Sequence, residues 1–571
     1  MGLLGTPVTI GKRLMTARDI PGPELFDLGF RKLIWAQTGR DAALEQIARL
    51  VAAVDLSVIH DNRESVERNF VESLSDELHT AVGPLLGRGI ALLSPLSLYV
   101  MIKEAVEFSP AEGPMLSADE LAKCILGVSH DLDDLGFDEQ AFPTFSQERQ
   151  REVQDQVTAT DVALASFFRN DPLEVIAAQA EYVWRQPWPV EEPHRTKGLG
   201  ESPAEVFQEA MGVAYDDFIR AGWAIWDQVQ SGTVRIDPEL LRSQYAIGEP
   251  VVRTLIEHCS ITVENLKAEL ERQRAEYQAA DLLRFHLQWR PLVVMPDQTW
   301  LVPRLQFAVQ RFFGDLPAWD VKETLETIDP GRAGRFWQGM AFVFEQRVGD
   351  VLTRLSTSEP GGVVVTETSM KLKFKSKSKT PKICDWGFNS GQIWLLLEVN
   401  NRRLNQNLAE GTGSFVDLKK EITGYLAETK FNQLYSTIDL LLKRGWNAGH
   451  AKVDSATTFV PLVIVPDTGL HSTFLLENEI KNTVRTRIQS YPRLRVMPPT
   501  VITWRDLLVL EGLAEKHGIN VCDVLREWRF TVGAHYPVTL GDFLFEKWPE
   551  RPRSSFELTT GNSLLALIQR A

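Results

Sequence analysis

The segment that most constrains the fold of this chain is 381–401, which reads PKICDWGFNSGQIWLLLEVNN. Asp385 precedes an apolar strand, Glu398 ends that strand, and Asn400 follows two positions later. Because side chains alternate across a strand, Glu398 and Asn400 are expected on one face. A hairpin-like return of the chain would then bring Asp385 beside them.

Two converging carboxylates are typical of a site for a hard divalent cation. Mg²⁺ prefers oxygen ligands and keeps some of its water, so the pair Asp385 and Glu398 would leave coordination positions open. A phosphate oxygen and an attacking water fit those positions. The segment therefore favours hydrolysis of phosphodiester bonds with Mg²⁺ or Mn²⁺ as the cofactor.

These residues form the pattern D-x12-E-x-N, which resembles the core of the PD-(D/E)XK nuclease superfamily. The motif of that superfamily is an Asp, a variable gap and then Glu-x-Lys. Asn400 stands where the family usually has a lysine that positions or activates the water. The resemblance implies a three-layer α/β/α domain over residues 331–500, with a helix before the first core strand and another after the strand that carries the Glu.

Both helices are predicted from the sequence. RFWQGMAFVFEQRVGDVLTRL is amphipathic and carries Glu345, at a place where many family members have a metal-site Glu. EITGYLAETKFNQLYSTIDLLLKRG has an apolar stripe, and its Lys430 and Gln433 lie on another face. Lys430 is therefore a candidate to replace the missing lysine, and Asn400 or Lys430 would orient the nucleophile.

The charge distribution favours nucleic acid as the partner of this segment. The whole chain has a net charge of −15, but residues 331–450 hold 17 Lys and Arg against 11 Asp and Glu, a local net charge of +6. Exposed cations suit a phosphate backbone, and in a strand the alternating lysines would line one face. A lysine-rich edge or exposed loop that discourages strand aggregation is the alternative interpretation. The candidate phosphate contacts are Lys371, Lys373, Lys375, Lys377, Lys379, Arg402 and Arg403.

The rest of the chain gives a mixed α+β organisation with no internal repeat. Residues 1–285 are predicted as a mainly helical region that acts as a sensor or scaffold, and 286–330 as a β-hairpin with a helical connector. The nuclease-like domain 331–500 is followed by a helical extension over 501–571. The segment 261–288 is predicted as one long charged helix, suited to a brace or a coiled-coil arm.

Cellular location and partners follow from negative features. The four cysteines are scattered without a C-x-x-C pair, and no apolar run is long enough for a membrane span, so a cytoplasmic protein with no membrane partner is expected. The helical region leaves open a homo-oligomer or a protein partner. The resemblance implies restriction, phage defence or mobile-element biology, and DNA is favoured over RNA as the substrate.

Two alternatives remain open at this stage. In the first, the nuclease fold is catalytically degraded and acts as a nucleic-acid-binding or protein-interaction module, a reading that Asn400 favours weakly. In the second, 331–500 is an unrelated α/β fold on a helical scaffold. The second alternative predicts that Asp385 and Glu398 lie more than about 10 Å apart, too far to share one metal ion.

Overall fold

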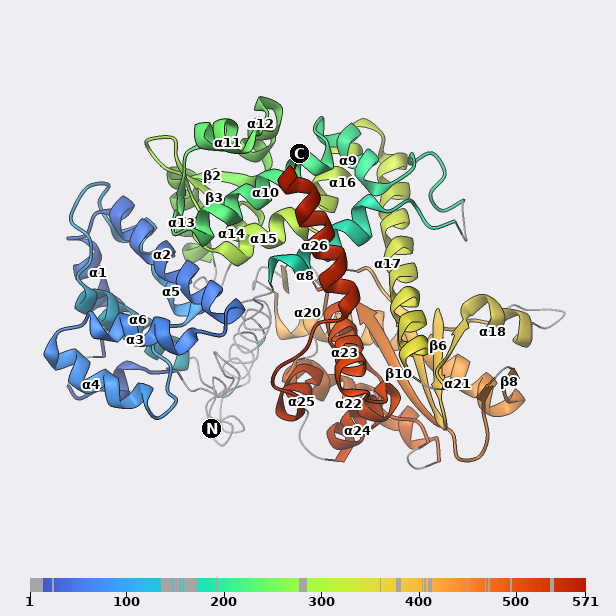
Figure 1. The fold of residues 1–571 in the computed structure, drawn as a ribbon. Helices are drawn as coiled ribbons and strands as arrows, with labels where there is room; N and C mark the ends of the chain where they lie inside the picture. The colour runs from blue at the N-terminus through green and yellow to red at the C-terminus, as the bar shows by residue number, and fades with distance from the viewer. Residues whose placement is uncertain are drawn as a thin grey trace.

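The computed structural model describes residues 14–22, 25–134, 146, 155, 158, 172–190, 194–276, 285–359, 361–375, 381–402, 404, 407–408, 413–448, 450–467, 469–470, 473–492, 495–534 and 539–570. The architecture of these residues is mixed α+β, with helices in the majority and three separate sheets (Figure 1).

The N-terminal part is a cluster of helices built around one that is almost entirely buried. Its helices are η1 (Ala17–Asp19), α1 (Leu28–Trp35), α2 (Arg40–Ile59), α3 (Arg63–Glu72), α4 (Asp76–Leu86), α5 (Pro95–Phe108) and α6 (Ala118–Asp134). Ser94 caps α5 by accepting a hydrogen bond from the Ser97 amide, and Pro95 takes the first helical position, where no donor is lost. Nearly every side chain of α5 is buried, and α2 packs along it.

The middle part combines helices with a small sheet. Its elements are α8 (Leu173–Ala180), η3 (Glu181–Arg185), α9 (Pro203–Met211), α10 (Tyr215–Gln230), β1 (Arg235–Ile236), α11 (Pro238–Tyr245), α12 (Glu249–Cys259), β2 (Ser260–Thr262), α13 (Val263–Glu276), α14 (Phe285–Trp289), β3 (Leu292–Val294), β4 (Trp300–Leu301), α15 (Leu305–Phe313) and α16 (Pro317–Ile328). The predicted hairpin is confirmed, since β3 and β4 pair antiparallel within a sheet of order β1-β4-β3-β2.

Two helix starts in these parts are capped by serine. Ser117 and Glu120 form a capping box, because each residue's side chain bonds the other's amide. Ser202 caps α9, but Glu205 accepts a hydrogen bond from the amide of Glu201 and not from that of Ser202. The predicted helix over 261–288 begins at Val263 after a strand, and residues 277–284 within it lie outside the described residues.

The C-terminal half is organised around a five-stranded sheet. Its elements are α17 (Pro330–Ser358), β5 (Val363–Thr366), α18 (Glu367–Phe374), β6 (Trp386–Ser390), β7 (Ile393–Val399), α20 (Phe415–Lys420), η5 (Glu421–Phe431), α21 (Asn432–Arg444), β8 (Asn447–Ala448), β9 (Ala451–Lys452), β10 (Thr458–Val465), α22 (Phe474–Gln489), β11 (Thr500–Thr503), α23 (Trp504–His517), α24 (Val521–Ala534), α25 (Leu540–Lys547) and α26 (Ser555–Arg570). The strand order is β11-β10-β7-β6-β5, with β5, β6 and β7 antiparallel and β7, β10 and β11 parallel.

Both faces of this sheet carry a hydrophobic core. All seven residues of β7 are buried, as a central strand covered on two sides requires. Leu395 and Leu397 pack with α17, α23 and α24 on one face, whereas Trp394 and Leu396 pack with η5, α21 and α22 on the other. β10 is a buried strand that ends before Pro466, and Thr503 and Asp506 form a capping box at the start of α23.

The described first part of the lysine-rich segment, through Phe374, is helical where the alternating lysines favoured a strand, and Lys377 and Lys379 lie outside the described residues. Thr366 caps α18 by accepting a hydrogen bond from the Ser369 amide, and Lys371 forms an i,i+4 ion pair with Glu367. Met370 and Phe374, four residues apart, are buried together, so the helical period outweighs the period of two in the lysines. Lys371 and Lys373 therefore point in different directions and do not form one strand face.

The last helix ties the C-terminal half to the middle part. Figure 1 shows α26 crossing the molecule toward α8, and α26 packs closely on α8 and α10. Leu564 and Ile568 of α26 belong to the same hydrophobic core as α5, α10 and α15. Among the described residues, no helix combines the length and apolar character needed to cross a bilayer.

Candidate active site

Strand pairing brings Asp385 and Glu398 together. Trp386 of β6 pairs with Leu397 of β7, so the preceding residue, Asp385, lies opposite Glu398 on the neighbouring strand. Oδ2 of Asp385 accepts a hydrogen bond of 2.7 Å from the amide of Val399, and the backbone carbonyl of Asp385 accepts one of 2.9 Å from the amide of Glu367. The two acids therefore adjoin, which excludes the separation of more than about 10 Å that an unrelated arrangement would require.

Lys430 lies beside this pair and comes from η5, a helical segment that covers one face of the sheet. Glu398 shares its strand face with Leu396, and that face packs against η5 and α21. The Nζ atom of Lys430 lies 2.8 Å from Oε2 of Glu398 and 3.3 Å from the carbonyl oxygen of Val399. Lys430 lies near the end of η5, a π-helical stretch inside an otherwise α-helical segment, and such stretches occur often at functional sites.

Burial and mutual repulsion perturb the two acids. Burial and the charge of Asp385 raise the pKa of Glu398 well above its usual value, although Lys430 opposes the shift. Burial also raises the pKa of Asp385, again against the charge of Lys430. For Lys430, burial lowers the pKa, but the charges of Glu398 and Asp385 outweigh it and the net shift is upward. The site thus buries two acids with one ammonium group, and an added cation would offset the repulsion between the two acids.

Glu345 lies near the pair but has its own partner. Burial, with a contribution from the charge of Asp385, raises the pKa of Glu345 to about 7. Nη1 of Arg195 lies 3.1 Å from Oε2 of Glu345, and the Arg195 guanidinium covers the ring of Phe342 at 4.8 Å. The backbone carbonyl of Glu345 accepts a hydrogen bond from the indole of Trp386. Glu345 is thereby held on α17 beside the strand that follows Asp385.

Asn400 and Gln433 have structural partners. Oδ1 of Asn400 accepts a hydrogen bond of 3.0 Å from the amide of Arg402, and this bond tightens the turn after β7. Its backbone amide bonds the carbonyl of Ile464 on β10. Gln433 donates to the carbonyl of Ile383. Of the two candidates for orienting a nucleophile, Asn400 and Lys430, only Lys430 is bonded to Glu398.

The candidate phosphate contacts do not form the single row along a strand that the alternating lysines suggested. Lys371 is engaged by Glu367, while Lys373 and Lys375 are exposed. Arg402 forms an ion pair of 2.8 Å with Glu421 and covers the ring of Tyr425. The predicted contacts that lie outside the described residues are Lys377, Lys379 and Arg403.

Two charged residues of the site were not found from the sequence. Arg195 comes from the segment before α9, 150 positions from its partner Glu345, and nothing local signals the contact. Glu367 begins α18 and its charge acts on Asp385, Glu398 and Glu345. Its position directly after a strand, as an acidic first-turn residue, was a usable signal.

The donor set fits a divalent cation held by two carboxylates. Among the described residues, no group of three or more His, Cys, Asp and Glu side chains is placed to hold a metal ion. Asp385 and Glu398 nevertheless form an adjoining pair, and Oε1 of Glu398 is buried with no hydrogen-bond partner. A buried carboxylate oxygen left without a partner is costly, and a metal ion with its own waters would satisfy it. Glu345 would then act from outside the immediate ligand set.

Comparisons of the chain with family models, with curated proteins and with solved structures return no match.

Proposed function

We propose that this protein is a metal-dependent nuclease that hydrolyses phosphodiester bonds in nucleic acid, with Mg²⁺ or Mn²⁺ as its cofactor. The observation that carries the proposal is the trio Asp385, Glu398 and Lys430. Two adjoining carboxylates, one with an unpartnered buried oxygen, meet an ammonium group 2.8 Å from Glu398. Two buried acids against one ammonium group leave an unbalanced negative charge, which a bound cation would offset.

The order of elements around the trio also supports the proposal. A long helix, α17, precedes three antiparallel strands, and a helical segment that carries Lys430 follows the strand of Glu398. Cores on both sheet faces make a three-layer α/β/α arrangement. This is the arrangement that resemblance to the PD-(D/E)XK superfamily implies, with Lys430 in the role of the motif lysine.

Each residue has a distinct role in the proposed reaction. Asp385 and Glu398 would hold the cation, which when bound polarises a phosphate oxygen and lowers the pKa of a bound water. Lys430 would donate a hydrogen bond to the nucleophile or to the phosphate while it balances the charge of Glu398. Glu345, with a pKa of about 7, is suited to accept a proton near neutral pH.

A cleavage assay with purified full-length protein tests the proposal. The substrates are linear, circular and single-stranded DNA and RNA, each with Mg²⁺ or Mn²⁺. The isosteric variants Asp385→Asn and Glu398→Gln keep the shape of the site and remove its charge. We expect metal-dependent cutting, with DNA favoured, that falls at least about 10²-fold in either variant. Cutting that survives both variants would contradict the assignment.

A second candidate function is a degraded nuclease fold that binds nucleic acid or a protein partner without cutting. The observation that favours it is Asn400, whose side chain bonds the amide of Arg402 and contributes no charge at the motif position. This candidate predicts binding without cleavage under any metal condition. Mn²⁺ titration of the wild-type protein and of Asp385→Asn separates an inactive metal site from one that is lost.

A further inference from the structure

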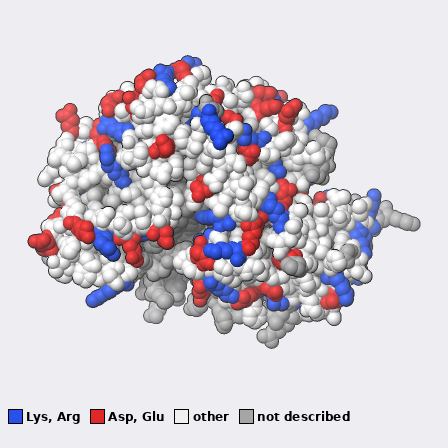
Figure 2. Space-filling view, in the orientation of Figure 1, with Lys and Arg blue, Asp and Glu red and all other residues white. Residues whose placement is uncertain are grey.

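Six exposed cations from separate segments gather at the end of the molecule where α18 lies, and we call this set the cationic surface. Its members are Lys373, Lys375, Lys382, Lys443, Arg444 and Lys452. Figure 2 shows several basic side chains at that end of this face, with few acidic ones beside them.

Direct contacts hold these segments together. Nη1 of Arg444, at the end of α21, donates a hydrogen bond of 2.9 Å to the carbonyl oxygen of Phe374 at the end of α18. The ammonium of Lys373 lies 5.9 Å from the ring centroid of Trp446. Ser436 of α21 donates to the carbonyl of Lys382, and Trp394 donates to the carbonyl of Lys452. These side-chain-to-backbone hydrogen bonds fix the segments that carry the cationic surface relative to one another.

Most of these cations lack an acidic partner. Lys373, Lys375, Lys382 and Lys443 form no ion pair with any described residue. Two nearby acids are engaged outside the surface, since Glu367 pairs with Lys371 and Asp439 pairs with Arg487. Asp454 pairs with a member of the surface, Lys452, at 3.6 Å. Glu428 on η5 is an exposed acid on the helix that leads into α21. In a chain of net charge −15, a group of unpaired lysines is a selective anion-binding feature.

The cationic surface begins at the carboxylate pair. Lys382 lies three residues before Asp385, and α18 starts at Glu367, whose amide bonds the carbonyl of Asp385. The eight residues of α18 span about 12 Å at the rise of an α-helix, so Lys373 and Lys375 lie roughly that far from the candidate metal site. That distance corresponds to a few nucleotides of backbone.

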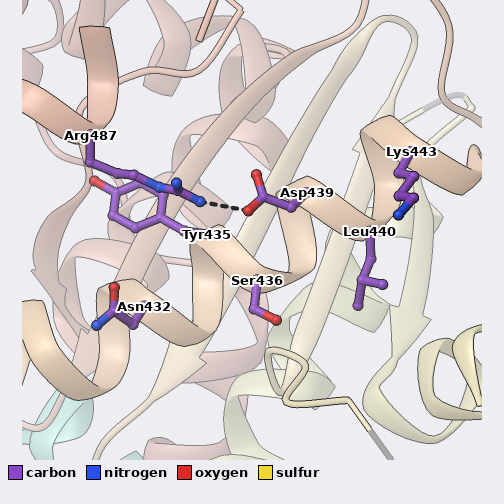
Figure 3. A pocket seen from close by; sticks show the side chains of 7 residues that line it. All are labelled: Asn432, Tyr435, Ser436, Asp439, Leu440, Lys443 and Arg487. Atoms are coloured by element: carbon purple, nitrogen blue, oxygen red, sulfur yellow. Dashed lines mark hydrogen bonds and ion pairs between the residues drawn. The ribbon is translucent and has the colours of Figure 1, made fainter. Parts of the chain in front are cut away.

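A surface hollow of about 380 Å³ borders the cationic surface along α21. Asn432, Ser436, Leu440 and Lys443 recur at helical spacing along this hollow, and Arg487 reaches across to Asp439 at 2.5 Å (Figure 3). Beside the apolar side chain of Leu440 and the carboxylate of Asp439, the lining offers hydroxyl, amide and ammonium groups. Such groups bond phosphate oxygens and sugars, which carry half or more of protein–DNA hydrogen bonds.

We propose that the cationic surface binds the phosphodiester backbone of nucleic acid beside the cutting site, an inference that rests on the proposed function and names how its substrate is held. A polyanion is favoured over an acidic protein because lysine is depleted in the cores of protein interfaces. Lysine ammonium groups are instead common phosphate contacts. The surface reads charge, so it binds without regard to base sequence.

The test measures nucleic-acid binding in EDTA, where no cutting occurs. The triple variant Lys373→Ala, Lys382→Ala and Lys443→Ala is compared with the full-length wild-type protein by fluorescence anisotropy. Labelled duplex DNA, single-stranded DNA and RNA are titrated across NaCl concentrations. We expect the variant to lose about tenfold or more in affinity and the slope of log K against log [NaCl] to fall by about two to three.

A matched control removes three exposed cations from the N-terminal and middle parts, Lys32→Ala, Arg68→Ala and Arg253→Ala, with the same change in net charge. We expect this control to bind within about twofold of wild type. Equal losses in both triples would show a general charge effect and overturn the proposal, as would unchanged binding in the first triple or binding of an acidic protein but no nucleic acid. Binding that depends on the cationic surface in a protein that never cuts would overturn only the proposed nuclease activity.

Discussion

The indole of Trp386 lies directly against Gly349 of α17, where a Cβ atom would overlap the six-membered ring. Trp386 also donates a hydrogen bond of 3.1 Å to the carbonyl oxygen of Glu345, one turn earlier on the same helix. Because Asp385 immediately precedes Trp386, this contact sets the distance between α17 and the carboxylate pair. The absence of a side chain at position 349 is thus part of how the site is positioned.

Replacement of Gly349 by alanine is expected to displace Trp386 and the start of β6. Overpacking of this kind costs about 1–3 kcal/mol of unfolding free energy, and we expect metal-dependent cleavage to fall with it. Chemical denaturation and the cleavage assay measure the two effects. Gly334→Ala on the same helix is the control, because nothing lies within 4 Å of its Cβ position and alanine favours helix by up to about 1 kcal/mol. Equal stability of the two variants would contradict this role for Gly349.

Lys430→Met removes the ammonium group beside Glu398 and keeps most of the side-chain volume. Loss of one partner of a buried ion pair leaves the other uncompensated, so we expect a loss of about 3 kcal/mol in unfolding free energy at pH 8 in EDTA. Added Mn²⁺ is expected to stabilise this variant more than wild type, because the metal replaces the missing positive charge. Thermal unfolding with and without Mn²⁺ measures both effects.

The control for that experiment is Lys420→Met on α20, where an exposed lysine pairs with Asp417. Surface pairs contribute at most about 1 kcal/mol, so this variant should be close to wild type. If Lys430→Met were equally close to wild type and responded no more strongly to Mn²⁺, the coupling between Lys430 and Glu398 would be refuted.

The raised pKa of Glu345 predicts a specific pH dependence of stability without metal. Its pKa is about 7 in the folded chain against 4.5 for the ordinary group. Below pH 4.5 the carboxyl is protonated in both states. Between pH 4.5 and 7 the unfolded chain releases its proton first, so the unfolding free energy falls, by up to about 3 kcal/mol.

Glu345→Gln removes this penalty. We therefore expect the variant to be more stable than wild type at pH 8 and equal to it at pH 4, as measured by urea denaturation in EDTA. Asp385, Glu367 and Arg195 are the charged groups that act on Glu345, and all three remain in the variant. Glu72→Gln, at an exposed position on α3, is expected to show no such difference. A pH-independent effect of Glu345→Gln would exclude titration as its cause.

Arg195, in the region before α9, is expected to control the pKa of Glu345. Its guanidinium lowers the pKa of Glu345, so Arg195→Ala should raise that pKa further, while Arg195→Lys should restore most of the effect. Carboxyl NMR of Glu345 across pH measures the shift directly. Lys197→Ala, an exposed cation two residues away, is the control and should leave the titration of Glu345 unchanged.

The sequence was most informative where local patterns determine structure. The apolar run that ends at Glu398 located β7, and the hairpin predicted within 286–330 is the antiparallel pair β3 and β4. The meeting of Asp385 and Glu398 also follows from local rules, because one strand alternates and its neighbour returns through a tight hairpin with Gly391 at a positive φ.

The sequence was least informative where distant segments meet or where two periods compete. Arg195 meets Glu345 through tertiary packing alone, so no local motif could predict this ion pair. The alternating lysines resemble a strand, but burial of Met370 with Phe374 and the cap at Thr366 favour a helix. Asn400 stands where the resemblance to the nuclease superfamily implies a lysine, and the ammonium group beside Glu398 comes from Lys430, 32 positions away.

The close packing of α26 on α8 predicts how a substitution in α26 changes the stability of the protein. Gly561 of α26 lies so close to α8 that a Cβ atom would overlap the carbonyl of Glu174. Gly561→Ala must therefore push the two helices apart, although alanine is the better helix former. We expect lower thermal stability and faster proteolytic release of α26, while Ser563→Ala, at an exposed position on the same helix, should change neither.

Because α26 shares a core with α10 and α15, undocking of α26 would loosen the middle part first. Cleavage by the distant carboxylate pair should then persist until the whole chain unfolds. Loss of cleavage before loss of the α26 contact would show that the two regions are coupled more tightly than this packing implies.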